Sequence, residues 1–329
     1  MANHGSSICP DSFVMSGEQK IVVLTGGVGS ERDVSLASGN SLHQSLQNYF
    51  PADLVEINEE KLPLHLDPLT DVIFPAVHGT FGEDGSLQQL LEDGGFVYAG
   101  SGIESSRLCM NKAEAKEAVS LAGLTVARDL RFQSPDSVDV EEAVNKLGQQ
   151  MVLKPTDQGS SVALHIISGS AHLLEVLNTL EKGNWMLEER ILGREISVGM
   201  LHNNSLGIVE IIPEGGVYDY KHKYTAGSTQ YKFPAVLDST VEDELKRATE
   251  EAFAQCKCRD FARVDFILNQ DGKPYFLKIN TIPGLTPTSL LPKSASCAGY
   301  NFDQLCKKLI EPAWNRLLQK TGQVHNFAA

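Results

Sequence analysis

A predicted β-hairpin near the C-terminus restricts the fold of this chain more than any other feature. Residues 263–268 and 274–280 form two apolar runs of strand length, and the Asp-Gly pair at 271–272 favours a two-residue turn between them. With that turn Gln270 pairs with Lys273, and counting outwards places Asp265 opposite Lys278. We therefore expect two antiparallel strands with opposite charges facing each other across them.

The hairpin has one polar and one apolar face, because side chains alternate along a strand. The polar face carries Arg263, Asp265, Lys278 and Asn280. The apolar face, which we expect to enter the core, carries Val264, Phe266, Leu277 and Ile279. A charged face on an apolar hairpin indicates a functional site, although an ordinary solvated sheet face has the same pattern.

The N-terminal region begins with a strand, a glycine turn and a helix, which is the first unit of an α/β domain. The strand is 21–25, the turn is 26–29, and the helix runs towards Phe50. A dinucleotide-binding turn would need a third glycine where Asp33 stands, so that function is not expected. Glu31 at the helix start is favourable beside the helix dipole, and it is also placed to bind a substrate ammonium.

Further strands are expected at 72–77, before the His78 loop, and at 96–99. A helix is expected over 105–122, followed by strands at 151–155 and 162–167, a helix at 171–181 and strands at 185–191, 196–201 and 207–212. An irregular stretch, 213–234, is long enough to be a lid. Helices over 241–256 and 302–319 complete the pattern.

Lys112, Lys154 and the Gly159-Ser160-Ser161 loop form a candidate phosphate site. Successive backbone N–H groups beside small side chains can surround phosphate oxygens, and two lysines can share the phosphate charge. An ordinary turn and two surface lysines would give the same letters, so each feature is weak alone.

Composition excludes several classes of protein. The chain has 329 residues, with 28 Lys and Arg against 42 Asp and Glu, a formal net charge of −14. Such an acidic surface argues against nucleic-acid and anionic-membrane binding. No window reaches the roughly 18 uninterrupted apolar residues of a membrane span, and residues 1–20 resemble a flexible tail rather than a signal peptide. Six cysteines without a C-x-x-C spacing indicate a cytoplasmic protein with incidental thiols.

Taken in order, the motifs of residues 21–318 resemble those of the D-alanine–D-alanine ligases of the ATP-grasp superfamily. The motifs are Gly26-Gly27 with Ser30-Glu31-Arg32-Asp33-Val34-Ser35, His78-Gly79 with Gly82-Glu83-Asp84-Gly85, Met110-Asn111-Lys112, Lys154-Pro155 with Gly159-Ser160-Ser161-Val162, Tyr218-Asp219-Tyr220 with Lys223-Tyr224, Arg263-Val264-Asp265, and Asn280-Thr281 with Pro283-Gly284-Leu285-Thr286.

The resemblance implies an α/β chain with the three-domain ATP-grasp fold, in which two α+β domains clasp ATP. The segments expected are a tail, 1–20, an N-terminal substrate domain, 21–100, a central ATP-grasp domain, 101–192, and a C-terminal catalytic domain, 193–329. The implied reaction joins two D-alanines through an acyl phosphate to make a peptidoglycan precursor, in a cytoplasmic homodimer.

The resemblance also assigns a role to each candidate residue. Glu31, Ser160, Tyr224, Arg263 and the Gly284 backbone are the implied catalytic groups. The implied D-alanine site adds His78, Ser289 and Leu290. The implied ATP site is Lys112, Lys154, Ser161, Glu188, Ile191, Glu195 and Lys223. Tyr224 favours a dipeptide product, because relatives that make D-alanyl-D-lactate usually lack this tyrosine.

One position departs from the family pattern. Lys278 stands where the family has a glutamate that bridges two Mg²⁺ ions, with Asp265 and Asn280 completing the ligand set. A charged lysine has no acceptor for a metal, so we expect a degraded site that holds one Mg²⁺ or none. ATP can still bind, because a glutamate with one Mg²⁺ carries the same net charge as a lysine. Two classes stay open: an active ligase with altered metal use, and a ligase-fold protein that binds nucleotide and D-alanine with little turnover.

Overall fold

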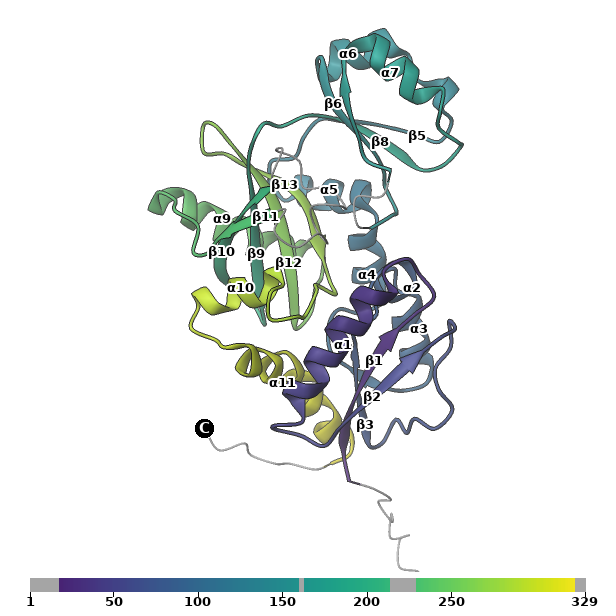
Figure 1. The fold of residues 1–329 in the computed structure, drawn as a ribbon, viewed down its shortest axis with the longest axis vertical. Helices are drawn as coiled ribbons and strands as arrows, with labels where there is room; N and C mark the ends of the chain where they lie inside the picture. Colours follow the sequence, from purple (N-terminus) through teal and green to yellow (C-terminus); the bar gives the residue numbers. More distant parts are fainter. Residues whose placement is uncertain (1–17, 160–162, 214–228, 323–329) are drawn as a thin grey trace, which may run out of the picture.

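The structure, a computed structural model, describes residues 18–159, 163–213 and 229–322, and these form three β-sheets (Figure 1). The N-terminal sheet is parallel, in the order β2-β1-β3-β4. Its strands are β1 (Lys20–Gly26), β2 (Ala52–Ile57), β3 (Asp71–Pro75) and β4 (Val97–Tyr98), and its helices are α1 (Arg32–Leu46), α2 (Thr80–Glu83) and α3 (Ser86–Asp93). The expected α/β unit is confirmed, but the pattern missed β2, a half-exposed edge strand without an apolar run.

The middle sheet is antiparallel, in the order β5-β8-β6-β7. Its elements are β5 (Asp129–Phe132), η1 (Pro135–Ser137), α6 (Val140–Leu147), β6 (Gln150–Pro155), β7 (His165–Ser168), α7 (Gly169–Leu177) and β8 (Trp185–Glu189). The predicted strand over 162–167 starts too early. Ala163 has a left-handed backbone, with a φ of 52°, and β7 begins at His165.

The C-terminal sheet has the order β11-β10-β9-β12-β13. Its strands are β9 (Gly193–Leu201), β10 (Asn204–Pro213), β11 (Thr229–Lys232), β12 (Phe261–Asn269) and β13 (Pro274–Asn280). Helices α4 (Ile103–Met110), α5 (Lys112–Leu121), α9 (Ser239–Gln255) and α10 (Leu290–Cys297) pack on it, whereas α11 (Phe302–Lys320) packs on α1, β3 and β4. No helix among the described residues is long and apolar enough to cross a membrane.

The predicted helix over 105–122 is two helices, because Asn111 interrupts it. Asn111 has an extended backbone, with φ −84° and ψ 100°, and its side chain accepts hydrogen bonds from the backbone N–H groups of Ala113 and Glu114. Asparagine is a preferred N-cap residue, and a glutamate three residues after the N-cap, here Glu114, is typical of the start of a helix. The break turns the chain so that Lys112, the first residue of α5, lines the cavity described below.

The hairpin places Asp265 opposite Lys278, as the sequence predicts, but its turn and strand register differ from the prediction. The turn is longer than expected, since Leu268 pairs with Pro274 and the Asn269 N–H donates to the Lys273 carbonyl at 3.0 Å. The predicted pairing of Gln270 with Lys273 was therefore wrong. A register shift between Asp265 and Phe266 offsets the extra loop residue.

This bulge also changes which side chains face the core. Phe276 is 3% exposed and packs in the core of the C-terminal sheet, whereas Leu277 is half-buried in the cavity wall beside Lys278. The prediction of Leu277 in the core was wrong, because a bulge turns two successive side chains to one face.

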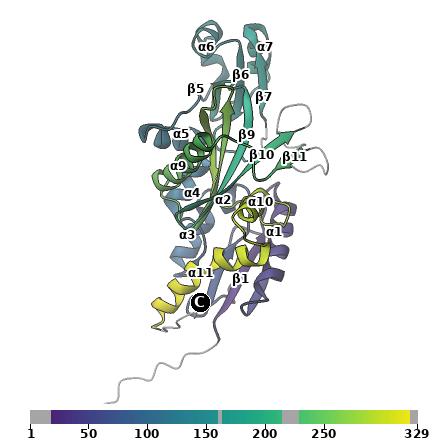
Figure 2. The same ribbon diagram turned by 90° about the vertical axis from the view of Figure 1, so that its left-hand side faces the viewer.

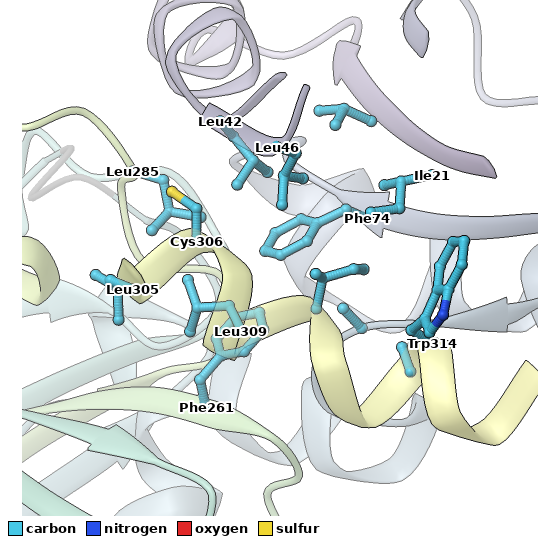
Figure 3. Close-up of a cluster of buried hydrophobic side chains, with 14 of the residues drawn as sticks. Ile21, Leu42, Leu46, Phe74, Phe261, Leu285, Leu305, Cys306, Leu309 and Trp314 are labelled. Carbon is cyan, nitrogen blue, oxygen red and sulfur yellow. The ribbon is translucent and has the colours of Figure 1, made fainter. Parts of the chain in front are cut away.

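A single apolar cluster joins the N-terminal sheet to α11 (Figure 3). Phe74 of β3 stacks on Phe261 of β12 with ring centroids 5.6 Å apart, and Phe50 lies 4.9 Å from Trp314 of α11. Figure 2 shows α11 running beside α1 and β1. The last helix of the chain therefore covers the first sheet and fixes it against the C-terminal sheet.

The three sheets fall within the three segments predicted from the sequence, but the cores do not follow those boundaries. Cys109, Ala115 and Val119 of α4 and α5 belong to the core of the C-terminal sheet. The division at 101 and 193 stays a prediction.

Asp260 is a buried charged link between the same parts. Arg316 of α11 donates to both of its carboxylate oxygens, at 2.9 and 2.7 Å, and the Gly100 N–H donates at 2.9 Å. Asp260 is 7% exposed, so its charge depends on these partners rather than on water.

We predict that Arg316→Met lowers the free energy of unfolding by about 3 kcal/mol, because it removes two hydrogen bonds to the buried Asp260 carboxylate and leaves it with the more distant Arg259, whose Nε lies 3.9 Å from Oδ2. Arg247→Met, at an exposed position of α9, is the control and should change it by less than about 0.5 kcal/mol. Urea unfolding of both variants measures the difference. Equal stabilities of the two variants would contradict the role given to Asp260.

Candidate active site

One cavity of about 1230 Å³ lies where the three sheets meet, and every described residue of the predicted site lines it. These residues are Glu31, His78, Lys112, Lys154, Glu188, Ile191, Glu195, Arg263, Asp265, Lys278, Asn280, Gly284, Ser289 and Leu290. The four remaining predicted residues, Ser160, Ser161, Lys223 and Tyr224, lie outside the described residues. Positions as far apart in the sequence as Glu31 and Leu290 thus converge on one space.

Asp265 is the most strongly held side chain in the cavity. It is 3% exposed and accepts two hydrogen bonds from Arg263 at 2.9 Å each and one from the Ser197 hydroxyl at 2.7 Å. Lys278 Nζ lies 3.6 Å from Oδ2, so the predicted pair is formed. Burial alone would raise the pKa of Asp265, but the charges of Arg263 and Lys278 and the hydrogen bonds lower it to about 2.

Glu188 joins two lysines on the far wall of the cavity. Its Oε1 accepts from Lys154, and its Oε2 accepts from Lys116 at 3.0 Å. Lys116 is 1% exposed and also lies 3.2 Å from Asp129. Burial opposes ionisation of Glu188, but the charges of Lys154 and Lys116 hold its pKa below the usual value. Glu188 is therefore an oriented anion that fixes Lys154.

Lys112 is held by backbone carbonyl groups at the end of β6 and in the loop that follows it. Its ammonium donates to the carbonyl of Gln158, with longer contacts to Pro155 and Thr156 at 3.4 and 3.5 Å. Burial, then the charges of Lys154 and Lys278, lower the pKa of Lys112 to about 7. Three lysines close enough to repel one another form a site that an anion would stabilise.

The Glu31 carboxylate lies in the cavity wall, between two glycines. A side chain at Gly79 or Gly159 would come within 3.4 or 3.0 Å of its Oε2. Gly79 also has a φ of 87°, which favours glycine. The missing side chains let the loops after β3 and β6 approach Glu31.

The Gly284 loop and the start of α10 form the remaining wall. Ser289, the N-cap of α10, accepts from the Thr286 N–H at 3.1 Å, and a side chain at Gly284 would lie 3.2 Å from its hydroxyl. The first N–H groups of a helix are suited to a carboxylate. Helix α10 was not predicted, although Ser289 followed by Pro292 is a recognisable helix start.

Two serines of α1 that sequence reasoning missed hold these loops in place. Ser35 Oγ accepts from the His78 N–H at 2.8 Å, while Ser38 Oγ lies 3.0 Å from His78 Nε2 and accepts from the Leu285 N–H at 3.2 Å. Their spacing from Glu31, four and seven residues, puts all three on one helix face, which is the signal that could have found them. Lys116 was also missed; its spacing from Lys112 is the same helical four.

The residues at the expected metal position do not fit two Mg²⁺ ions. Asp265 accepts from Arg263 and Ser197, and Asn280 Oδ1 accepts from the Ile282 N–H at 2.8 Å. Lys278 adds a cation instead of a third oxygen ligand. In the described part of the chain no group of three or more His, Cys, Asp or Glu side chains is arranged to hold a metal ion.

The cavity thus brings three lysines and an arginine together with the Glu31 carboxylate and the N-terminus of α10. This arrangement, between a middle and a C-terminal antiparallel sheet, is that of an ATP-grasp enzyme, and the solved structures agree. A D-alanine–D-alanine ligase from Bacillus anthracis complexed with ATP superimposes with a TM-score of 0.80 at 30% identity, over 93% of this chain and 100% of that one. The VanG D-Ala:D-Ser ligase from Enterococcus faecalis superimposes with a TM-score of 0.79 at 27% identity, over 90% and 100%.

Curated sequences give the family. The family described as D-ala D-ala ligase C-terminus matches residues 119–311. A D-alanine–D-alanine ligase from an Anaeromyxobacter species is 37% identical over 90% of this chain and 97% of its own length. Another, from Citrifermentans bemidjiense, is 38% identical over 90% and 96%. The chain belongs to the D-alanine–D-alanine ligase family.

We predict that Lys112→Met stabilises the ligand-free protein, and more at pH 6 than at pH 9. The folded-state pKa of about 7 lies below the ordinary 10.5. Below pH 7 the Lys112 ammonium therefore lowers the free energy of unfolding by its full amount. This destabilisation becomes smaller as the pH rises towards 10.5. Urea unfolding at both pH values measures it, with the exposed Lys182→Met as the control. A Lys112→Met protein less stable than the parent at pH 6 would refute the assignment.

Proposed function

We propose that this protein uses ATP to join two D-alanines into D-alanyl-D-alanine through an acyl phosphate, for peptidoglycan precursor synthesis. The observation that carries the proposal is the single cavity lined by Glu31, Lys112, Lys154, Arg263 and the Gly284 loop. Membership of the D-alanine–D-alanine ligase family and the likeness to an ATP complex support it. We expect the enzyme in the cytoplasm, where ATP is made, and as a homodimer, which sedimentation would test.

The cationic end of the cavity suits the triphosphate of ATP. Lys112, Lys154 and Lys278 supply three positive charges, and the anion would relieve the repulsion that lowers the pKa of Lys112. Leu192 and Leu277 give the cavity an apolar wall suited to a base. In this proposal Glu188 and Glu195 hold the adenine and ribose, and Lys116 keeps Glu188 ionised and oriented.

A carboxylate is a poor electrophile, so the carboxylate of the first D-alanine must be activated before it reacts. Transfer of the γ-phosphoryl group to the carboxylate of the first D-alanine gives an acyl phosphate, while Glu31 holds its ammonium. The amine of the second D-alanine attacks the carbonyl carbon, a tetrahedral oxyanion forms beside Arg263 and the Gly284 N–H, and phosphate leaves. Catalysis then rests on positioning and on stabilising the oxyanion.

The second substrate is bound, in this proposal, by its carboxylate at Ser289 and Leu290. The N-terminus of α10 directs N–H groups and a partial positive charge to that point. Tyr224 and Ser160 would link to Glu31 and close the site. The structural likeness to a D-Ala:D-Ser ligase makes D-serine the first alternative second substrate to test.

Lys278 supports a second candidate function. Its ammonium, 3.6 Å from Asp265, lies where the family pattern has a metal-bridging carboxylate. A fixed cation can hold phosphates, but it cannot coordinate two of them together during transfer. A ligase-fold protein that binds nucleotide and D-alanine with little turnover therefore remains the alternative.

Product analysis distinguishes the two candidates. The chain is incubated with ATP and D-alanine, and ADP, phosphate and dipeptide are measured; L-alanine is the control, and D-serine and D-lactate are tested as second substrates. Dipeptide formed in step with ADP supports the ligase. Binding of ATP and D-alanine without dipeptide supports the binding protein.

We predict that Lys278→Glu raises kcat by roughly a thousandfold in the presence of Mg²⁺, because it restores the bridging carboxylate. Lys278→Met, which removes the cation without adding a ligand, should weaken ATP binding and leave kcat low. In the absence of Mg²⁺ the free energy of unfolding should fall for Lys278→Glu, because a second carboxylate then lies beside the buried Asp265. A parent protein that binds two Mg²⁺ and matches the Lys278→Glu rate would contradict this reading of the site.

A further inference from the structure

Two thiols that are 149 residues apart in sequence meet at the back of the cavity. Cys109 lies near the end of α4, and Cys258 lies between α9 and β12. Their sulfur atoms are 3.7 Å apart. Because a disulfide has a sulfur–sulfur distance of about 2.05 Å, the two atoms need to approach by less than about 2 Å to bond.

The two thiols have different surroundings. Cys109 is 6% exposed, whereas Cys258 is half-buried and accepts a hydrogen bond from the Ser105 hydroxyl at 3.4 Å. Hydrogen bonding from Cys109, with that from Ser105, lowers the pKa of Cys258, while contacts with Cys256 and Cys258 and burial raise the pKa of Cys109. A half-buried thiol with a lowered pKa, 3.7 Å from a buried thiol, is the arrangement of a reactive cysteine and its resolving partner.

We propose that Cys258 and Cys109 form a reversible disulfide when the protein meets a peroxide. The Cys258 thiolate attacks one oxygen of hydrogen peroxide, the O–O bond breaks, and hydroxide leaves to give a sulfenic acid. Cys109 then attacks the Cys258 sulfur, its thiol proton goes to the departing hydroxyl, and water leaves. The hydroxide takes up the proton that Cys258 lost on ionising, so two sulfurs are oxidised by one electron each and one peroxide is reduced to two waters.

The location links this modification to the nucleotide end of the cavity. Cys109 lines the cavity and is three residues before Lys112, just before the helix break at Asn111. Helix α4 packs on β13, the strand that carries Lys278. A disulfide would tie the end of α4 to the segment before β12 and restrict the movement of Lys112 towards phosphates. Formation of the bond is independent of the proposed function; its effect on ATP rests on it.

The test treats the reduced full-length protein with hydrogen peroxide. Peptide mapping by mass spectrometry should find residues 109 and 258 cross-linked, and ATP affinity by calorimetry should fall by about tenfold, within the usual range for coupled sites. Dithiothreitol should restore it. Cys258→Ser should give no cross-link, and peroxide should not change its ATP affinity. Cys109→Ala should likewise bind ATP equally well before and after peroxide treatment. Cys297→Ser, which removes another half-buried thiol, should behave like the parent.

Three results would overturn the proposal: a cross-link between Cys109 and Cys256, a Cys258→Ser variant as sensitive to peroxide as the parent, or a cross-linked protein with unchanged ATP affinity. If the cross-link forms in a protein that binds no ATP when reduced, the proposed function fails while the disulfide assignment stands.

Discussion

The cavity depends on one buried carboxylate, that of Asp265. Removed from water, it needs compensating charge, and it receives it from Arg263 and Lys278 together with the Ser197 hydroxyl. These contacts fix the guanidinium of Arg263 and the ammonium of Lys278 on the face of β12 and β13 that borders the cavity. The same contacts occupy the oxygens that a metal would use. One interaction therefore both organises the cationic end of the site and explains why the metal position is altered.

Packing outside the cavity sets the position of the β12 and β13 face relative to the rest of the site. Helix α11 and Phe261 bury the apolar side of the N-terminal sheet, and Asp260 adds a charged link through Arg316. Ser38 of α1 then connects the Gly284 loop to His78 across the same boundary. Glu31 begins α1, beside the N-terminal sheet, whereas Arg263 lies on β12 of the C-terminal sheet. The reaction proposed here therefore needs this packing to hold both groups at one substrate.

The sequence predicts most of the architecture, because apolar runs, glycine turns and ordered motifs are local signals. It fails where the decisive contact is not local. The half-exposed β2 has no apolar run, and the bulge that turns Leu277 into the cavity arises from the register between two strands. The pairing of Asp265 with Lys278 was predicted correctly only because the longer turn and the bulge shift the strand register in opposite directions. Lys116 and Ser38 lie outside the motifs, Ser35 ends a motif that assigned it no role, and the meeting of Cys109 with Cys258 depends wholly on the tertiary fold.

We infer that Lys278 supplies, from within the protein, positive charge of the kind that a metal ion supplies in the family pattern. Calorimetric titration of the reduced protein with ATP, once in excess EDTA and once in excess Mg²⁺, tests this inference. The two dissociation constants should lie within about threefold of each other, a difference of less than about 1 kcal/mol. A dissociation constant roughly a hundredfold larger in EDTA would contradict it, because the site would then depend on a metal that Lys278 is proposed to replace.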